Sequence, residues 1–217
     1  MPIDFSIKKN YQTMKRRNFL TTAGLATIAL SCNTVDKKNG VAAQNAQAIK
    51  EQPLLPPVNI PEGEGRSFWG PGGDKYEFLV TGKQSANTTF ILHADVPVGG
   101  GPPPHIHNNE SESYYVDEGE LLFIVGDQTI HAKAGDLVHI PKGTVHTFTN
   151  TGTKNAKMLT VFAPSGMEGW FEEVLVPVKD KSEKAVVYTK KQLDFMIEAG
   201  PRHGVTWRLP PETGKGG

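Results

Sequence analysis

Two short stretches of the sequence place three histidines and one glutamate at spacings that suit β-strands. His105 and His107 are separated by one residue, Glu112 follows in the same stretch, and His146 lies in a second stretch, GDLVHIPKGTVHTFTN. Alternate residues on a strand point to the same face, so His105 and His107 project together, about 6.5–7 Å apart along the backbone. Three imidazoles and one carboxylate would form a nitrogen- and oxygen-donor site for a first-row transition metal, provided that the fold brings them together.

The segments around these residues have the composition of short strands joined by turns. Leu121–Val125 and Leu137–Ile140 are strand-like runs, and Pro141–Gly143 turns the chain before His146 and Phe148, which share one face of the next segment. Several short strands separated by Gly, Pro and Asp predict an all-β fold, either an antiparallel barrel or a sandwich. The interior of such a fold is where the strands that carry the four side chains can converge.

The two stretches resemble both signature motifs of the cupin family at every spacing. The first motif is matched by Gly99, His105, His107, Glu112 and Gly119, and the second by Gly135, Pro141, Gly143, His146 and Asn150. The flanking sequence is similar to that of single-domain quercetin-dioxygenase-like cupins. The resemblance implies a jelly-roll barrel that holds one divalent transition metal (Fe, Mn, Ni, Co, Cu or Zn), with His105, His107, Glu112 and His146 as its ligands.

Several residues near the motifs leave alternatives open. Glu110 is a competing ligand, but the strand phase and the motif spacing favour Glu112, which leaves Glu110 as a loop charge. The motif residues can also be a remnant that no longer holds metal. The histidines outside the motifs are expected to be surface or packing residues: His93, His131, His139 and His203. Because Cys32 is the only cysteine, no thiolate serves the metal and no intramolecular disulfide forms.

Two functions from different classes remain. The resemblance implies a metal-dependent dioxygenase that acts on a hydroxylated aromatic (flavonol-like) or enol-like small molecule, with Glu112 both as a ligand and as the base that accepts the substrate proton. The alternative is a non-catalytic metal-holding or small-ligand-binding cupin at the cell envelope, because one fold serves many activities. Apolar walls for the substrate are expected from Phe90, Leu92, Tyr114, Phe123, Phe148 and Phe162.

The N-terminal segment 1–32 is predicted to be an export signal. Lys15–Leu20 contains the pair Arg16-Arg17 followed by Phe-Leu, which resembles the twin-arginine signal of bacterial export. The apolar stretch Thr21–Leu30 has the length of a signal peptide and is too short to span a bilayer, for which about 20 residues are needed. Translation can start at Met1 or at Met14, and the later start gives the short charged beginning that is usual in such signals.

Cys32 is the residue through which the exported protein is expected to be anchored to a membrane. Residues 29–32, Ala-Leu-Ser-Cys, resemble a lipoprotein processing box, although Ala29 replaces the usual Leu. This predicts a mature protein that begins at Cys32, is lipid-anchored there, and lies in the periplasm or on the outer face of the bacterial cytoplasmic membrane. A free cysteine in a cleaved peptide is the alternative.

The rest of the chain divides into a tether, one domain and a tail. Residues 33–58 predict a flexible tether, 59–201 a single cupin domain, and 202–217 a C-terminal tail. Within the domain, two short C-terminal helices are predicted over 166–175 and 192–199, with apolar faces formed by Met167, Trp170, Phe171 and Val174 in the first and by Leu193, Met196 and Ile197 in the second.

Composition limits the partners. Lys and Arg together number 23, and so do Asp and Glu, so the chain has no excess of positive charge to bind nucleic acid. The expected partners are therefore a small-molecule substrate and, through the lipid anchor alone, a membrane. Assembly as a homodimer is left open.

Overall fold

The computed structural model describes residues 54–180 and 182–209. The predicted export signal, the start site and Cys32 therefore lie outside the described residues, as does most of the predicted tether. Residues 54–58 belong to neither a helix nor a strand and are exposed. No helix within the described ranges is long and apolar enough to cross a membrane.

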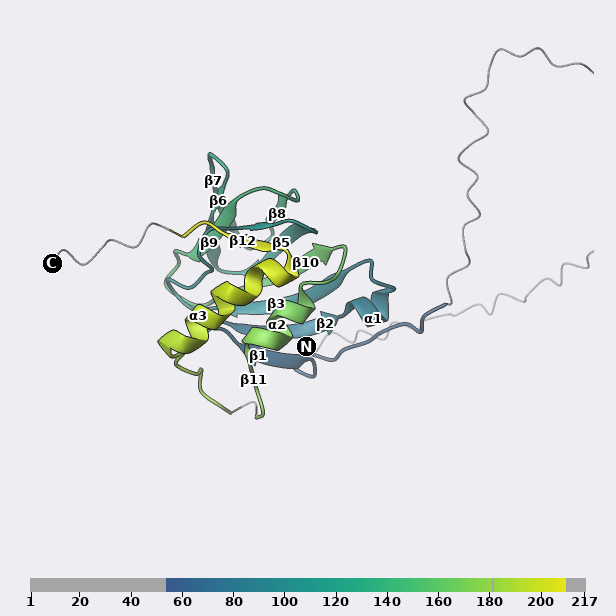
Figure 1. Ribbon diagram of the computed structural model, residues 1–217. Coiled ribbons are helices and arrows are strands. Elements are labelled where there is room, and N and C mark those ends of the chain that lie inside the picture. Colours follow the sequence, from purple (N-terminus) through teal and green to yellow (C-terminus); the bar gives the residue numbers. More distant parts are fainter. Residues whose placement is uncertain (1–53, 181, 210–217) are drawn as a thin grey trace, which may run out of the picture. The chain divides into compact units, whose positions relative to one another are not determined.

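The described chain is mostly β-structure with a few short helices (Figure 1). The strands of the first half are β1 (Arg66–Trp69), β2 (Lys75–Val80), β3 (Phe90–Val96), β4 (His105–His107), β5 (Ser111–Glu118) and β6 (Glu120–Val125). Those of the second half are β7 (Gln128–Lys133), β8 (Leu137–Ile140), β9 (His146–Asn150), β10 (Ala156–Ala163), β11 (Val176–Pro177) and β12 (Val205–Trp207). The helices are α1 (Gly82–Ser85), α2 (Glu168–Val174), α3 (Lys190–Ala199) and the 3₁₀ turn η1 (Gly200–His203).

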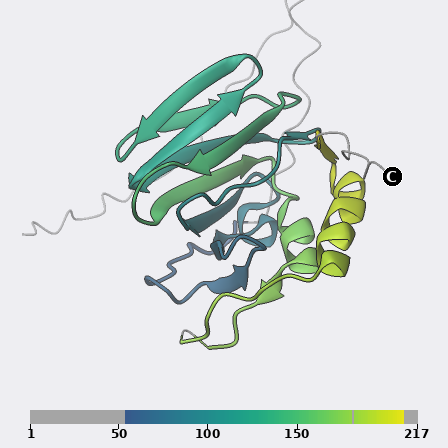
Figure 2. The ribbon, with the colours of Figure 1, turned by 90° about the vertical axis from the view of Figure 1, so that its left-hand side faces the viewer.

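The strands form two antiparallel sheets. One sheet has seven strands in the order β11-β1-β2-β3-β10-β5-β8, and the other has five in the order β12-β4-β9-β6-β7. In Figure 2 the strands are seen as stacked layers, with α2 (green) and α3 (yellow) together on one side of them. The predicted all-β class with short C-terminal helices is confirmed.

Strict alternation along the two central strands explains why one face of the large sheet is the core. In β3 and in β10 every second residue is buried, and the register joins Phe90 to Phe162 and Leu92 to Thr160. Side chains of a strand alternate between the two faces of its sheet, so the buried set faces the second sheet and the intermediate set faces outward. The apolar side chains between the sheets remove a large apolar surface from water, which is the main stabilising contribution to such a fold.

Two motif residues support the strands that carry the site. Gly119 turns the chain between β5 and β6 at a φ of +83°, and a Cβ there would lie 3.0 Å from the Cα of Ala156. Only glycine adopts this backbone region without strain, and only glycine allows this close approach. Asn150, at the end of β9, donates from Nδ2 to the carbonyls of Val96 and Lys154, at 2.8 and 2.9 Å. These two residues therefore have structural rather than chemical roles.

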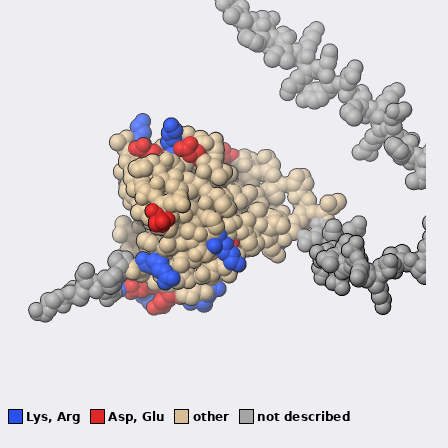
Figure 3. Space-filling model, turned by 90° about the horizontal axis from the view of Figure 1, so that it is seen from above, with Lys and Arg blue, Asp and Glu red and all other residues tan. Residues whose placement is uncertain are grey.

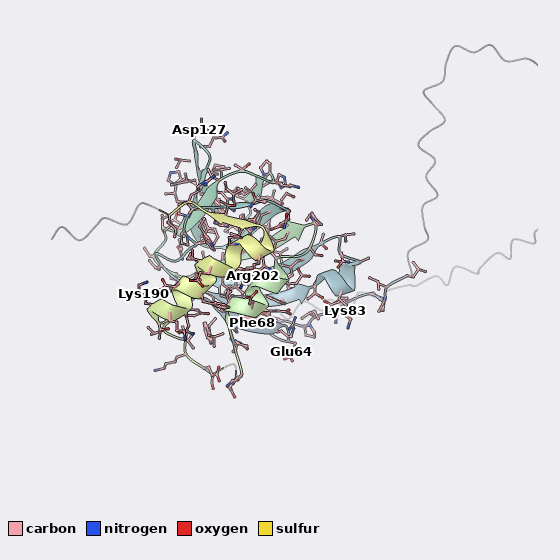
Figure 4. All side chains as sticks on the ribbon, viewed as in Figure 1. Glu64, Phe68, Lys83, Asp127, Lys190 and Arg202 are labelled. Carbon is pink, nitrogen blue, oxygen red and sulfur yellow. The ribbon has the colours of Figure 1, made fainter. Side chains whose placement is uncertain are left out.

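The C-terminal helices form near their predicted positions and pack against each other. α2 buries Trp170, Phe171 and Val174, and α3 begins at a capping box in which Thr189 and Gln192 each accept from the backbone N–H of the other. On the predicted apolar face of α3, Met196 is buried and Leu193 is exposed. Figure 4 labels Lys190 at the start of α3 and Arg202 in η1, which follows it.

The structure differs from the prediction at the C-terminal end of the domain. The segment 202–217 is predicted to be a tail, but β12 pairs antiparallel with β4, so that Val205 lies opposite His107 and Trp207 opposite His105. The backbone N–H of Arg208 also donates to the carbonyl of Pro104 at 2.8 Å. β12 therefore covers the edge of the strand that carries two of the predicted ligands. A three-residue strand is too short to show the alternation from which strands are predicted.

Charges on the surface do not gather by sign on the face shown in Figure 3. Lys and Arg (blue) and Asp and Glu (red) lie scattered among uncharged residues there. Several of the exposed charges are paired with one another, including Arg66 with Glu172 and Lys157 with Glu118. Such exposed pairs contribute little to stability, because water screens their charges.

Candidate metal centre

The four predicted ligands come from three strands in two sheets. His105 and His107 lie on β4, His146 lies on β9 directly opposite His105, and all three belong to the five-stranded sheet. Glu112 lies on β5 of the seven-stranded sheet. The two histidines of β4 point the same way because they are two residues apart on a strand. The cluster thus lies between the sheets, where strands that are distant in the sequence face each other.

The structure brings all four side chains together. One ligand atom from each of His105, His107, Glu112 and His146 lies within 4.8 Å of the others, and all four residues are at most 6% exposed. Nε2 of His105 is 3.1 Å from Nε2 of His107, and Oε2 of Glu112 is 3.0 Å from Nε2 of His146 and 3.3 Å from Nε2 of His107.

The outer nitrogen of each ring is tied to an oxygen. Nδ1 of His105 donates to the carbonyl of Pro103 at 2.9 Å, and Nδ1 of His146 donates to the carbonyl of Thr144 at 3.0 Å. Nδ1 of His107 lies 2.7 Å from Oε1 of Glu110. Because a carbonyl or carboxylate oxygen accepts, each Nδ1 carries the hydrogen. In the neutral rings, Nε2 is therefore the atom with a free lone pair.

This arrangement of tautomers leaves the centre of the cluster rich in acceptors. Three Nε2 lone pairs and a carboxylate oxygen converge within hydrogen-bond distance of one another. Buried acceptors that face one another repel, and either a proton or a metal cation must lie between them. Two or three imidazoles with a carboxylate suit zinc, copper, iron and nickel, whereas soft thiolate ligands are absent from the cluster. The donor set therefore fits one divalent transition metal.

Glu110 is not the loop charge that the sequence predicts. It is 2% exposed, and its carboxylate accepts from Nδ1 of His107. Carboxylates that hold the outer nitrogen of a metal-binding histidine fix the orientation of the ring and raise its basicity. The i, i+3 spacing of His107 and Glu110 at the end of a strand is the only signal of this role in the sequence, and it is weak. Glu110 is thus a positioning residue, and Glu112 faces the cluster.

Burial and neighbouring charges alter the protonation of the metal-free cluster. Burial, followed by the charges of His146 and His107, lowers the pKa of His105 to about 3. Burial also acts to lower the pKa of His107, but the charges and hydrogen bonds of Glu112 and Glu110 outweigh it and raise that pKa to about 9. Burial acts to raise the pKa of Glu112, but His107 and His146 outweigh it and lower that pKa. The metal-free cluster therefore holds a proton on His107 beside an ionised Glu112.

The cluster opens into an apolar cavity of about 100 Å³. Of the walls predicted from the sequence, Leu92, Tyr114, Phe148 and Phe162 line it, whereas Phe90 and Phe123 are buried elsewhere in the core. Seven further lining residues come from the C-terminal elements: Met167, Trp170, Phe171, Leu175, Met196, Val205 and Trp207. The sequence predicts the apolar face of the first C-terminal helix, but the contribution of β12 is a feature of the tertiary structure alone.

The phenol of Tyr114 lies in the same cavity as the carboxylate of Glu112. Glu112 and Tyr114 alternate on β5 and both line the cavity. Burial raises the pKa of Tyr114 well above 10, and the charge of Glu112 and a hydrogen bond to it raise that pKa further. The phenol therefore remains protonated and donates to the carboxylate.

None of the four remaining histidines of the described chain that were predicted to lie outside the site enters the cluster. His93 lies 3.2 Å from Asp117, His203 lies 2.6 Å from Glu173, and His139 bonds to Ser113. His131 lies exposed on β7.

A family model matches the part of the chain that carries the candidate site. Residues 92–162 match the model described as a cupin domain, and the two antiparallel sheets with a few short helices form a cupin fold. The segment contains Glu112 and all three clustered histidines, so the candidate metal centre lies inside the matched domain.

Two curated relatives are distant enzymes. The chain is 28% identical over 116 residues to quercetin 2,3-dioxygenase of Bacillus subtilis, a match that covers 53% of this chain and 34% of the relative. It is 31% identical over 109 residues to acireductone dioxygenase of Leptospira biflexa, covering 45% of this chain and 60% of the relative. The matches thus span between about a third and three fifths of the relatives' length. Among solved structures, a predicted oxalate decarboxylase from Thermotoga maritima has 23% identity and a TM-score of 0.45, covering 49% of this chain and 97% of that one.

Proposed function

We propose that the protein binds one divalent transition metal through His105, His107, Glu112 and His146 and acts as a metal-dependent dioxygenase on a small hydroxylated aromatic or enol-like molecule. The observation that carries this proposal is the convergence of three Nε2 lone pairs and one carboxylate at the wall of an apolar cavity. Four protein ligands leave one or two coordination positions of a divalent metal for other oxygen donors.

The residues of the cluster and its surroundings are placed to accept a proton from a substrate. A bound divalent metal would polarise a hydroxyl or enol oxygen of the substrate and favour its deprotonation. Oε2 of Glu112 lies beside two imidazoles at the edge of the cavity, where it can accept that proton. The phenol of Tyr114 donates to the same carboxylate and orients it. The apolar walls exclude water, which strengthens the electrostatic interactions inside.

The size of the cavity favours a compact or slender substrate. Pockets for drug-sized ligands have volumes of roughly 300–1,000 Å³, whereas this cavity measures about 100 Å³. A single aromatic ring or an enol fits this volume better than a three-ring flavonol. The names of the relatives, one a quercetin dioxygenase and one an acireductone dioxygenase, support oxygenation of an enol-bearing molecule.

The first test measures the metal. Elemental analysis of the purified protein should give one equivalent of a transition metal, and His146→Ala should lose most of it. His139→Ala is the matched control, because His139 is exposed and bonded to Ser113 outside the cluster. A His146→Ala protein that keeps a full equivalent would refute the assignment of the ligands.

The second test measures turnover. The metal-loaded protein should consume oxygen with one or more members of a panel of catechols, flavonols and enols. Glu112→Gln keeps the shape and an oxygen donor but loses the basicity, so turnover should fall more than metal content does, by about 10²–10⁴-fold. Equal losses of metal and activity would make Glu112 a ligand only. No oxygen uptake with any substrate of the panel would favour the alternative function, a non-catalytic metal or ligand binder.

A further inference from the structure

A carboxyl outside the metal cluster lines the same cavity. Asp74 lies in the turn between β1 and β2, immediately before β2, and is 3% exposed. Its Oδ1 is buried and has no hydrogen-bond partner among the described residues. Buried polar groups in folded proteins are nearly always hydrogen-bonded, and one that is not marks a place where a partner is missing.

Glycines leave the room that this carboxyl occupies. A Cβ on Gly70 would lie 3.4 Å from Oδ2 of Asp74, one on Gly72 would lie 3.0 Å from Oδ2, and one on Gly100 would lie 2.9 Å from Oδ1. Oδ2 thus faces the turn, and Oδ1 faces Gly100, in the segment that leads to His105. Burial raises the pKa of Asp74 to about 6, and the charge of Asp95 adds to this, against the opposing effect of backbone N–H groups of the turn.

The strand register places Asp74 far from the metal cluster along the sheet. Glu112 on β5 pairs with Phe162 on β10, whereas Met158 on β10 is joined through Ala94 on β3 to Tyr76 on β2. Alternate residues of a strand share a face, so each step of two residues along β10 leads to the next inward-facing position, here called a level. Phe162 and Met158 are four residues apart, so Tyr76 lies two levels from Glu112. Asp74 lies one level further, because it precedes Tyr76 by two residues.

Tyr76 connects the two ends of the cavity. Its ring lines the cavity together with Asp74 and Glu112. Burial raises its pKa well above 10, and the charges of Asp74 and then of Glu112 raise it further, so the phenol lies within electrostatic range of both carboxylates and remains protonated. Between them the walls are apolar, including Leu92, Met158 and the helix residues.

The indole of Trp207 differs from Asp74, although its Nε1 is also buried without a partner. Trp207 lines the cavity, but its Nε1 is packed against Gly200, so that a Cβ there would collide with it. That N–H therefore lies next to the backbone of η1. Asp74 is the carboxyl that combines burial, a free oxygen and a place in the cavity wall.

We propose that Asp74, with Tyr76 beside it, forms a second polar subsite at the far end of the cavity, which binds a hydrogen-bond donor of the substrate, a hydroxyl or a protonated amine. The inference rests on the proposed function and narrows its substrate class. The substrate then has an oxygen-bearing head at the metal, a slender apolar middle and a donor group at its tail. A hydrogen bond from that tail gives Oδ1 the partner that the protein does not supply.

Matched probes test the subsite by binding alone. The metal-loaded protein, kept without oxygen, is titrated with catechols that carry at position 4 an unbranched chain, from ethyl to hexyl, ending in methyl, hydroxyl or ammonium. At the chain length that places the end group at Asp74, the hydroxyl and ammonium probes should bind the wild type about 10-fold tighter than the methyl probe of the same length. A hydrogen bond to a charged or polar group contributes a difference of this size.

Variants of Asp74 test whether the preference for the hydroxyl and ammonium probes depends on its carboxylate. Asp74→Ala should abolish it for both donor probes, and the isosteric Asp74→Asn should abolish it for ammonium while keeping it in part for hydroxyl. Asp117→Asn is the matched control, since Asp117 faces His93 on the exposed surface and does not line the cavity. It should keep both preferences.

Failure of the subsite and failure of the proposed function give different results. If catechols bind but no chain length produces a preference that depends on Asp74, the subsite is wrong and the proposed function stands. If no probe binds the metal-loaded protein at any chain length, both the subsite and the proposed substrate class are wrong.

Discussion

Nδ1 of His107 donates a hydrogen bond to Oε1 of Glu110, with 2.7 Å between the two atoms. Both side chains are almost completely buried, so the contact is shielded from water. It fixes Nε2 of His107 as the nitrogen that faces Glu112 and His105. Among the three clustered histidines, His107 alone has a carboxylate on its outer nitrogen, because the other two bond to backbone carbonyls. Glu110 can therefore tune the cluster through a side chain that a single substitution alters.

We expect Glu110→Gln to lower metal affinity by about 10–100-fold, the range typical of a lost partner on a metal-binding histidine. The amide keeps an acceptor for Nδ1 but loses the charge that makes His107 more basic. Competition with a chelator of known affinity measures the change.

Asp117→Asn is the control for that experiment. Asp117 also faces a histidine, His93, but at 3.2 Å on the exposed surface and outside the cluster. Its removal should leave metal affinity unchanged. Equal affinities for the wild type and Glu110→Gln would mean that Glu110 has only a structural role.

Metal uptake should release about one proton at pH 7. In the metal-free protein the pKa of His107 is raised to about 9, so this ring is protonated at pH 7, whereas the pKa of His105 is lowered to about 3 and that ring is neutral. A metal binds only the neutral ring. Affinity should therefore increase about tenfold per pH unit up to about pH 9.

Calorimetry in buffers with different ionisation enthalpies counts the released protons. The apparent binding enthalpy should change linearly with the buffer enthalpy, with a slope near one proton. A slope of zero at pH 7 would show that His107 is already neutral before the metal binds.

Asp74→Asn should stabilise the protein at neutral pH. The pKa of Asp74 is raised from 3.8 to about 6 in the folded state, so the folded protein binds this proton more tightly than the unfolded chain. The stability that this protonation contributes is fully present below about pH 4 and is lost as the pH rises through 6. A shift of this size corresponds to about 2–3 kcal/mol at pH 7.

Urea unfolding of both proteins at pH 4 and at pH 7.5 measures the effect. The free energy of unfolding of Asp74→Asn should exceed that of the wild type at pH 7.5, and the difference should shrink at pH 4. The same difference at both values would show that Asp74 does not titrate in this window.

Export remains a prediction from the N-terminal sequence. Changing Arg16 and Arg17 together to Lys should keep the protein in the cytoplasm, because twin-arginine signals depend on the guanidinium pair. Cys32→Ala should release the exported protein from the membrane fraction, since one lipid-modified residue would be its anchor. Fractionation and immunoblotting measure both. A Cys32→Ala protein that stays in the membrane fraction would contradict the lipid anchor and leave plain export.

The sequence by itself determined which four side chains cluster and the class of fold. His105 and His107 lie two residues apart, and this spacing puts them on one face of any strand, whatever surrounds it. The turn residues Gly119 and Gly143 take positive φ angles that few other residues adopt, so they mark the strand ends locally. These features depend only on residues that are close together in the chain, so they can be predicted from the sequence.

Only the tertiary structure decided which groups support the cluster and which shape the cavity. The sequence predicts that Glu110 is a loop charge, yet the turn after β4 places its carboxylate within hydrogen-bond distance of Nδ1 of His107. Asp74 and Trp207 lie 31 residues before His105 and 61 residues after His146, and both line the cavity beside them. Burial, pKa and the choice of a hydrogen-bond partner depend on segments that are distant in the sequence, because strand pairing across two sheets brings them together.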